Sequence, residues 1–278
     1  MKDPNAPASM FPDDAKEFLQ KNAEGTYLLL DVRQPFEYEE AHLPGALLIP
    51  LPRLADSLAE IDPRKPVLVY CAVGGRSRMA AQLLTHQGVT NVFHLEGGIQ
   101  AWEDPTARGP VEFHLQFVRG DESPEEIIQL AYRMEEGLKK FHQSVRERTD
   151  EREFARLLDS LIKAEESHER TLLSLLPHED DKDKMLETLS QKADKGLMEG
   201  GMDIADFMKR NERFLQSLSG YLELAMMIET QALDLYLRMA HESTHENTRR
   251  VLLQIGNEEK GHLTLLARYM EQQGTSGK

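Results

Sequence analysis

Four Glu-x-x-His units stand in the sequence, at residues 39/42, 165/168, 242/245 and 259/262. On a helix this spacing puts a carboxylate and an imidazole on one face, where both can reach one divalent cation. The same spacing also arises by chance on charged helix faces. A further feature must therefore decide which of the four units could do chemistry.

An internal repeat singles out two of the four units. A shift of 94 residues places residues 131–142 on 225–236, and residues 164–173 on 258–267. It superimposes three pairs of side chains: Glu135 on Glu229, Glu165 on Glu259, and His168 on His262. In each repeat the two glutamates are 30 residues apart, which puts them at one height in an antiparallel helix pair joined by a short turn.

The repeat therefore predicts that four carboxylates and two imidazoles converge. The segments around Glu165 and Glu229 are apolar, and burying unpaired carboxylates is costly. Two divalent ions would neutralise four carboxylates, so we predict a dinuclear metal centre. The units at 39/42 and 242/245 lack this arrangement, and we interpret them as a loop and as surface or capping residues.

A second candidate for chemistry is Cys71, the single cysteine, in the stretch VLVYCAVGGRSRMAA. An apolar strand would end at Cys71, and a Gly-Gly loop would lead into a helix whose N-terminal amides face the thiol. These amides and the charge of Arg76 would lower the pKa of the thiol and activate it as a nucleophile. A buried structural cysteine is the alternative, but the glycines and Arg76 favour a reactive thiol.

The first part of the chain has the pattern of short elements separated by turns, because ten of the 13 prolines lie in residues 1–105. Predicted strands are residues 27–32, 46–51, 67–73 and 91–97, and predicted helices are residues 11–23, 52–61 and 77–88. The alternation predicts an α/β fold, with a mainly parallel sheet covered by helices on both faces.

From Ser123 onward the apolar period changes to three or four residues. Ser123 and Pro124, followed by two glutamates, form a good helix start. Long helices are predicted at about 124–149, 151–176, 211–241 and 245–273, with a long crossing segment between the second and third. We therefore expect an α/β domain at 1–105, a linker at 106–123, and an all-α, ferritin-like four-helix bundle at 124–278.

The composition of the chain limits the classes of partner and the cellular compartment that we expect. The net charge of −15 argues against nucleic acid or an anionic membrane surface as the main partner. No apolar run approaches the ~20 residues of a membrane helix, and the N-terminus lacks the apolar core of a signal peptide. A single cysteine excludes an internal disulfide and multi-cysteine zinc or iron–sulfur sites, so a reducing cytoplasm is the simplest setting.

Residues about 10–105 resemble a single-domain rhodanese. The motif C-x-x-G-x-R is met by Cys71, Gly74 and Arg76, and further matches are LLLDVRQPFEYEEAHLPGA and LEGGIQAWE. The resemblance implies a sulfurtransferase in which Cys71 and Arg76 are catalytic and Cys71 carries sulfur from a sulfane-sulfur donor to a thiol acceptor as a persulfide. The loop that cradles the sulfur would comprise Ala72, Val73, Gly74, Gly75 and Ser77.

Residues about 124–273 resemble the rubrerythrin branch of the ferritin-like family. The resemblance implies two iron ions, although such ligands would also accept manganese. Its implied roles are bridging for Glu165 and Glu259, terminal for Glu135 and Glu229, and binding of one iron each for His168 and His262. The four-cysteine rubredoxin module is missing, so an external electron donor is expected. By analogy with the family, we also expect a homodimer.

Two further positions distinguish this sequence within the family. Ala232 stands one helical turn after Glu229, where the family carries an extra carboxylate, so a redox-linked movement of iron between ligands is not expected. His142 and Tyr236 lie seven residues after Glu135 and Glu229. Hydrogen bonding to the ligands and plain packing both remain open for this pair.

Two functions follow from these patterns. The first is a two-domain enzyme in which Cys71 transfers sulfur and a di-iron centre acts as a peroxidase or oxidase. The alternative is a rhodanese whose metal-binding bundle serves dimerisation or redox sensing without turnover.

Overall fold

The computed structural model describes residues 7–110, 121–176, 197–198 and 202–276, together with Lys182, Met185 and Glu187. The chain divides into two compact units, Met1–Phe113 and His114–Lys278. Within the described residues, no helix combines the length and the apolar character that a membrane crossing requires.

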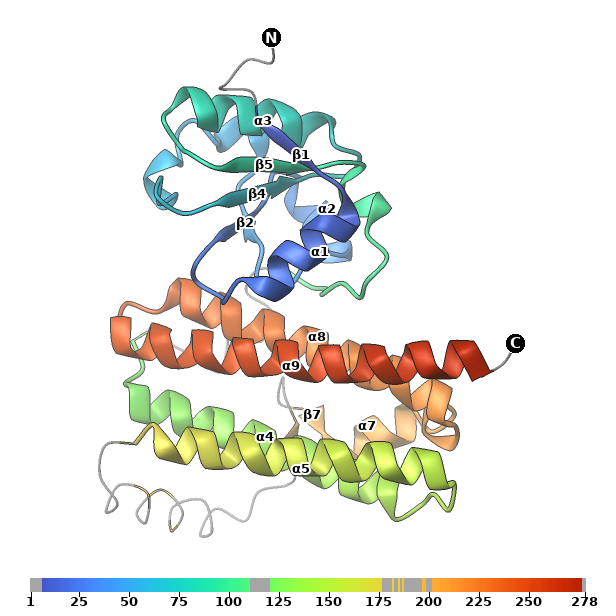
Figure 1. Cartoon of the computed structure of the whole chain (residues 1–278). Coiled ribbons are helices and arrows are strands. Elements are labelled where there is room, and N and C mark those ends of the chain that lie inside the picture. The colour runs from blue at the N-terminus through green and yellow to red at the C-terminus, as the bar shows by residue number, and fades with distance from the viewer. Residues whose placement is uncertain are drawn as a thin grey trace. The chain divides into compact units, whose positions relative to one another are not determined.

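Five parallel strands form the sheet of the first unit (Figure 1). They are β1 (Ala8–Met10), β2 (Leu28–Asp31), β3 (Leu47–Leu48), β4 (Val67–Tyr70) and β5 (Val92–Leu95). Their order is β1-β5-β4-β2-β3, and every neighbouring pair is parallel. The strand that precedes Cys71 is therefore the middle strand, which is completely buried.

Helices cover both faces of this sheet, which confirms the predicted α/β class. Successive side chains of a strand point to opposite faces. Val67 and Val69 pack with residues of α3 (Gly75–His86), whereas Leu68 and Tyr70 pack with residues of α1 and α2. The latter two helices are Pro12–Lys21 and Pro35–Glu40.

Some local predictions for the first unit were wrong. Residues 52–61 do not form an α-helix, because the backbone leaves the helical region at Ser57 (φ −104°, ψ 13°) and only two 3-10 turns form, Leu51–Arg53 and Leu58–Glu60. The edge strand β1 and the short helix α2 were not predicted from the sequence.

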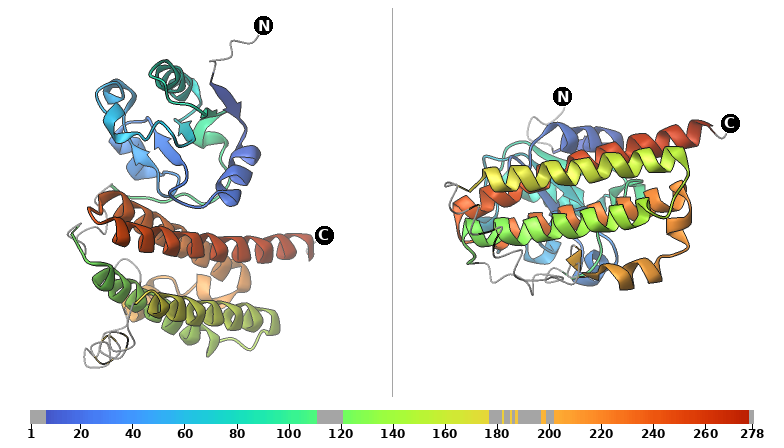
Figure 2. Two further views of the ribbon diagram at one scale, coloured as in Figure 1. Left: turned by 60° about the vertical axis from the view of Figure 1, so that its left-hand side comes forward. Right: turned by 90° about the horizontal axis from the view of Figure 1, so that it is seen from below.

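The second unit is a helical bundle, as predicted, apart from one short strand pair (Figure 1). Its long helices are α4 (Pro124–Arg146), α5 (Arg152–Ser174), α8 (Leu218–Glu242) and α9 (Glu246–Ser276). In Figure 2, α4 and α5 form one layer and α8 and α9 form the other. The predicted helix start is confirmed, because Ser123 and Glu126 form a reciprocal capping box at the start of α4.

The third long helix begins later than predicted. Residue 211 follows a separate short helix, α7 (Ile204–Arg210), and α8 starts only at Leu218. Ser217 is extended (φ −141°, ψ 150°) and its Oγ atom accepts a hydrogen bond from the Gly220 amide at 3.1 Å, which caps the new helix. The predicted crossing segment lies largely outside the described residues, apart from pieces such as the strand pair β6 (Leu197–Met198) and β7 (Met202–Asp203).

Two apolar clusters fill the bundle at different heights. One contains Leu138, Phe141 and Leu161 among its buried residues, and the other contains Ala131, Met134 and further side chains from α8 and α9. Glu135 lies between the two clusters in the sequence of α4 and is itself completely buried. The bundle thus encloses a polar layer between apolar ones, which is where the repeat placed the candidate ligands.

Candidate active sites

The Cys71 thiol lies at the carboxyl end of the middle strand, where the chain turns into α3. The thiol is buried, and the Gly74 N–H donates a hydrogen bond to its Sγ atom at 3.1 Å. Gly74 has a φ of +98°, a left-handed conformation that favours glycine and bends the loop around the sulfur. Ser77 Oγ is 3.5 Å from Sγ on the first turn of α3. The thiol therefore lies beside the N-terminus of α3, as predicted.

A second turn, at Gly97 and Gly98, holds the backbone of this loop in place through hydrogen bonds. The Ile99 amide donates to the Cys71 carbonyl oxygen at 2.8 Å, and the Gln100 amide donates to the Ala72 carbonyl at 3.1 Å. Gly98, with a φ of +62°, lies so close that a Cβ there would meet Cys71 O at 2.4 Å. The motif LEGGIQAWE thus contributes backbone contacts rather than side-chain chemistry.

The loop makes the thiol more acidic than an ordinary cysteine. Burial raises the pKa of the Cys71 thiol, but the Ser77 side chain and the amides of Val73, Gly74 and Ser77 outweigh it, so the pKa is lowered. Hydrogen bonds to the charged form have this effect because they stabilise the thiolate. A thiolate that is held by loop amides can attack a polarised sulfur.

The charge of Arg76 interacts with Cys71, and Arg76 also forms an ion pair that the sequence did not predict. Its two terminal guanidinium nitrogens each donate to a carboxylate oxygen of Glu37 on α2, both at 2.7 Å. The hydrogen bond from Arg76 lowers the pKa of Glu37 to about 2. The larger contributions to the acidity of Cys71 come from Ser77 and the loop amides, and Arg76 ties the start of α3 to α2.

The six predicted metal ligands lie together inside the bundle. None is more than 8% exposed, and the four glutamates are at most 1% exposed. The set consists of Glu135 on α4, Glu165 and His168 on α5, Glu229 on α8, and Glu259 and His262 on α9. The imidazole rings of the two histidines stack with their centroids 4.3 Å apart.

The distances within this cluster follow the repeat. His168 Nδ1 is 3.4 Å from Glu135 Oε2, and His262 Nδ1 is 3.1 Å from the matching oxygen of Glu229. Glu165 lies between the two halves, 3.9 Å from His168 Nδ1 and 3.6 Å from His262 Nδ1. A carboxylate in this position suits the bridging role that the family resemblance implies.

The donor set fits a pair of divalent cations. Overlapping sets of three ligand atoms lie within 4.8 Å of one another, and one such set is Glu229, Glu259 and His262. Among the described residues, Glu229 Oε1 and His262 Nε2 are buried atoms without a hydrogen-bond partner. Four carboxylates would balance the four charges of two such ions, which removes the cost of burying them unneutralised.

The charges of these side chains depend strongly on one another. Burial raises the pKa of Glu229, but the neighbouring His262 outweighs it, and the pKa of Glu229 falls to about 2. Burial lowers the pKa of His262, and the nearby carboxylates, Glu229 foremost, bring it above its usual value. A cation that takes the place of the imidazole proton would bind more tightly as the pH rises.

Three side chains border the cluster, and the sequence had identified only Tyr236 as a possible hydrogen-bond partner of a ligand. Tyr221 on α8 forms a hydrogen bond between its hydroxyl and His142 Nδ1 at 2.5 Å. Glu258 Oε2 is 3.6 Å from His168 Nε2, and the Tyr236 hydroxyl donates to Glu135 Oε1 at 3.4 Å. Tyr221 could not be found from the repeat, because the shift by 94 residues gives it no polar counterpart near a ligand.

The other two Glu-x-x-His units stay outside the cluster. Glu242 is the last residue of α8 and is exposed, and His245 is exposed in the turn before α9. Glu39 is exposed on α2, whereas His42 is buried and stacks on Tyr38 with centroids 3.6 Å apart.

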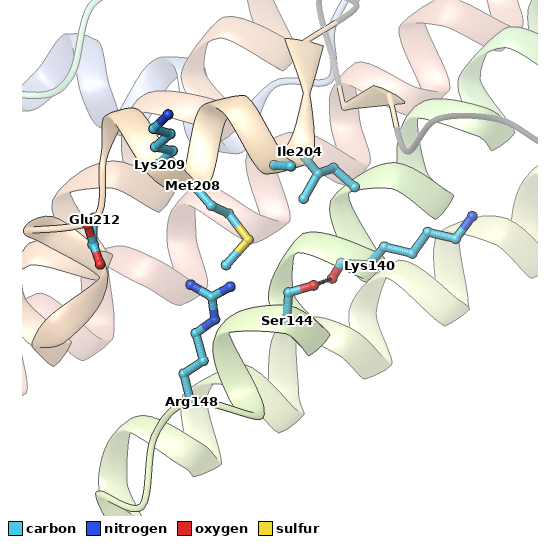
Figure 3. A pocket seen from close by; sticks show the side chains of 8 residues that line it. Lys140, Ser144, Arg148, Ile204, Met208, Lys209 and Glu212 are labelled. Carbon is cyan, nitrogen blue, oxygen red and sulfur yellow. Dashed lines mark hydrogen bonds between the residues drawn. The ribbon is translucent and has the colours of Figure 1, made fainter.

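A groove of about 660 Å³ lies between α4 and α7, away from the buried carboxylates (Figure 3). Lys140 and Ser144 line it from α4, Arg148 lines it from the turn that follows α4, and Met208 and Lys209 line it from α7. Its polar side chains are at the surface, and Ser144 Oγ is already bonded to the Lys140 carbonyl oxygen at 2.8 Å. The groove therefore has no activated nucleophile and is separate from the buried carboxylates.

Known protein families match both parts of the chain. The family model described as "Rhodanese-like domain" matches residues 14–105, and the model described as "Rubrerythrin" matches residues 77–176. The second match contains Glu135, Glu165 and His168, whereas their repeats lie beyond its end.

Individual relatives match the first part of the chain. A Bacillus subtilis (strain 168) protein, "Uncharacterized protein YqhL", is 45% identical over 74 residues, which are 27% of this chain and 59% of that protein. The chloroplastic rhodanese-like/PpiC domain-containing protein 12 of Arabidopsis thaliana is 42% identical over 78 residues, 27% of this chain and 26% of that protein. The chain thus spans less than two thirds of either relative.

Solved structures also match the first part of the chain. A rhodanese-related protein of Thermoplasma volcanium is 33% identical, with 34% of this chain and 89% of that chain covered and a TM-score of 0.31. A rhodanese-like domain protein of Staphylococcus aureus is 29% identical, with 35% and 92% covered and a TM-score of 0.33. The chain thus joins a rhodanese-like domain to a rubrerythrin domain.

Proposed function

We propose that this protein has two activities: sulfur transfer through a persulfide on Cys71, and reduction of peroxide at a dinuclear metal centre in the bundle. The observation that best supports the first is the Gly74 amide 3.1 Å from Cys71 Sγ at the start of α3. The observation that best supports the second is the convergence of four buried carboxylates from four helices.

The sulfur-transfer cycle needs only the thiolate and its loop. The Cys71 thiolate attacks the outer sulfur of a donor such as thiosulfate and forms an S–S bond. The donor's own S–S bond breaks, and sulfite leaves with the electron pair. A thiolate or cyanide then attacks the outer sulfur of the persulfide, and the Cys71 thiolate leaves. The amides of residues 72–77 would hold the extra negative sulfur, as the Gly74 amide holds Sγ.

Thiocyanate formation from thiosulfate and cyanide tests this activity. The account expects turnover by the full chain and none above background in the Cys71→Ser variant. Unchanged turnover in that variant would remove Cys71 as the nucleophile.

In the bundle, the six acidic and imidazole side chains would hold two iron or manganese ions. When bound, a pair of ferrous ions would supply the two electrons that, with two protons, reduce one peroxide to two waters. The buried glutamates would hold the ions by charge, and the apolar clusters above and below would exclude bulk water. An external electron donor would restore the reduced state, and we propose a homodimer by analogy with the family.

Peroxide consumption by the reduced, iron-loaded protein tests this second activity. We expect consumption in the wild type and its loss, together with the loss of iron, in Glu165→Ala. Two ions per chain with no peroxide or oxygen consumption under any donor would instead support a bundle that serves dimerisation or sensing.

A further inference from the structure

The two repeats of the bundle differ at one buried position beside the cluster. Seven residues after the first glutamate of each repeat stands His142 in α4 and Tyr236 in α8. Both side chains are completely buried. Because the repeats place them at matching heights, each would approach one half of the cluster, and the chemical difference between imidazole and phenol would fall on one half alone.

His142 Nε2 faces the cluster, and it offers a lone pair when the Nδ1–H donates to the Tyr221 hydroxyl oxygen. Its Nδ1 atom is held by the Tyr221 hydroxyl at 2.5 Å, which leaves Nε2 to face the other way. Nε2 is 3.5 Å from Glu165 Oε1 and, within the described part of the chain, has no hydrogen-bond partner. Ligand atoms of His142, Glu165 and Glu229 all lie within 4.8 Å of one another, a spacing that one cation can fill.

Tyr236 behaves differently at the matching position. Its hydroxyl donates to Glu135 Oε1 at 3.4 Å and so supports a carboxylate of the other half. A neutral phenol serves as a hydrogen-bond donor, whereas a neutral imidazole with a lone pair on Nε2 is a common ligand for transition metals. The half near Glu135 therefore gains a hydrogen bond, and the half near Glu229 gains a nitrogen donor.

The outer nitrogens of the two paired histidines show the same asymmetry. His168 Nε2 is 3.6 Å from the Glu258 carboxylate, a contact that orients an imidazole for binding through Nδ1. In the first repeat the position of Glu258 is taken by Ala164, and His262 Nε2 has no hydrogen-bond partner among the described residues. The two halves thus differ in their candidate ligand atoms and in the side chains that orient those ligands.

We propose that His142 is a seventh ligand, which binds through Nε2 to the ion held by Glu229 and His262. This inference rests on the proposed dinuclear centre. It makes the two positions unequal, because one ion would have two nitrogen donors and the other, near Glu135 and His168, would have one. Imidazole favours cobalt, zinc and iron, whereas carboxylate-rich sites suit manganese, so late divalent ions would fill the nitrogen-rich position first.

The probe is Co²⁺, titrated into the full-length protein after chelation. Each histidine bound to paramagnetic Co²⁺ keeps one exchangeable N–H proton, which appears as a separate shifted proton NMR signal in water. The proposal expects three such signals in the wild type and two in His142→Gln, which keeps size and polarity without the imidazole. It also expects one of the two Co²⁺ affinities to fall at least about tenfold in that variant, with the other little changed.

Controls separate a ligand from a packing residue. Tyr236→Phe alters the matching position and should retain three signals. His142→Ala, with a thermal unfolding curve to verify its fold, should also give two signals, and added imidazole should restore the third. Two ions bound with only two signals in the wild type, or three signals in His142→Gln, would overturn the assignment and leave the dinuclear centre intact. Failure to bind any Co²⁺ would overturn both.

Discussion

The two candidate sites of this protein are built in opposite ways. The thiol site is one continuous loop at the end of β4, and its main contacts to sulfur come from residues within six positions of Cys71. The carboxylate cluster draws one residue each from α4 and α8 and two each from α5 and α9. A continuous site depends on local backbone geometry, whereas a convergent site depends on the packing of the whole bundle. Substitutions should therefore separate the two sites.

The largest effect is expected for Cys71→Ser. The sulfur-transfer rate should fall at least about a thousandfold, because a serine hydroxyl cannot replace the thiolate as nucleophile and leaving group. Thiocyanate formation measures the rate, and the metal content should stay unchanged. Loss of metal in this variant would break the separation between the two sites.

Glu165→Ala should have the converse effect. It removes the carboxylate that lies within 3.9 Å of both Nδ1 atoms of the paired histidines, so metal affinity should fall at least about a hundredfold. Metal titration measures the affinity, while thiocyanate formation should persist at the wild-type rate. The matched control is Glu166→Ala, one residue on and exposed, which should bind metal normally. Equal losses in both variants would argue against a specific site.

Gly98→Ala should test how far the thiol loop relies on backbone fit. The new Cβ would meet backbone atoms of Cys71 and Ala72 at 2.4 and 2.5 Å, and φ is +62°. We expect about 1–3 kcal/mol lower free energy of unfolding of the first unit. Trp102, the single tryptophan, reports that unfolding by fluorescence in urea. The control is Gly75→Ala, whose Cβ meets nothing within 4 Å, and it should leave the free energy of unfolding unchanged. A decrease as large as for Gly98→Ala would contradict this account.

The smallest effect concerns thiol acidity. Because hydrogen bonds lower the pKa of Cys71, alkylation by iodoacetamide should reach half its maximal rate below pH of about 8.5, the ordinary cysteine value. Ser77→Ala removes one of these bonds and should move the midpoint upward. Thr85→Ala, which removes a hydroxyl bonded to the Ala81 carbonyl on the same helix, should leave it in place.

Features that are contiguous or repeated in the sequence could be predicted from it. Apolar runs and turn residues were enough to predict the parallel sheet and the bundle, and the capping box at Ser123 marked a helix start directly. The loop around Cys71 could be predicted because the residues that form it are contiguous in the sequence. The carboxylate cluster could be predicted because the sequence contains an internal repeat. The shift of 94 residues showed which distant glutamates and histidines occupy equivalent positions.

Partners without a repeat or a local motif could not be predicted. Glu37 binds Arg76 from 39 positions away, and Tyr221 holds His142 from 79 positions away. Both pairs are set by how helices pack, which periodicity alone does not specify. The break at Ser57 was missed for a related reason, since an amphipathic pattern does not show where the backbone leaves the helical region.

Anomalous diffraction from crystals of the iron-loaded full-length protein tests the central claim most directly. The account predicts two strong peaks at the iron edge, one beside Glu135 and His168 and the other beside Glu229 and His262, with Glu165 and Glu259 between them. A map without peaks inside the bundle, or with iron bound only at surface carboxylates, would contradict it.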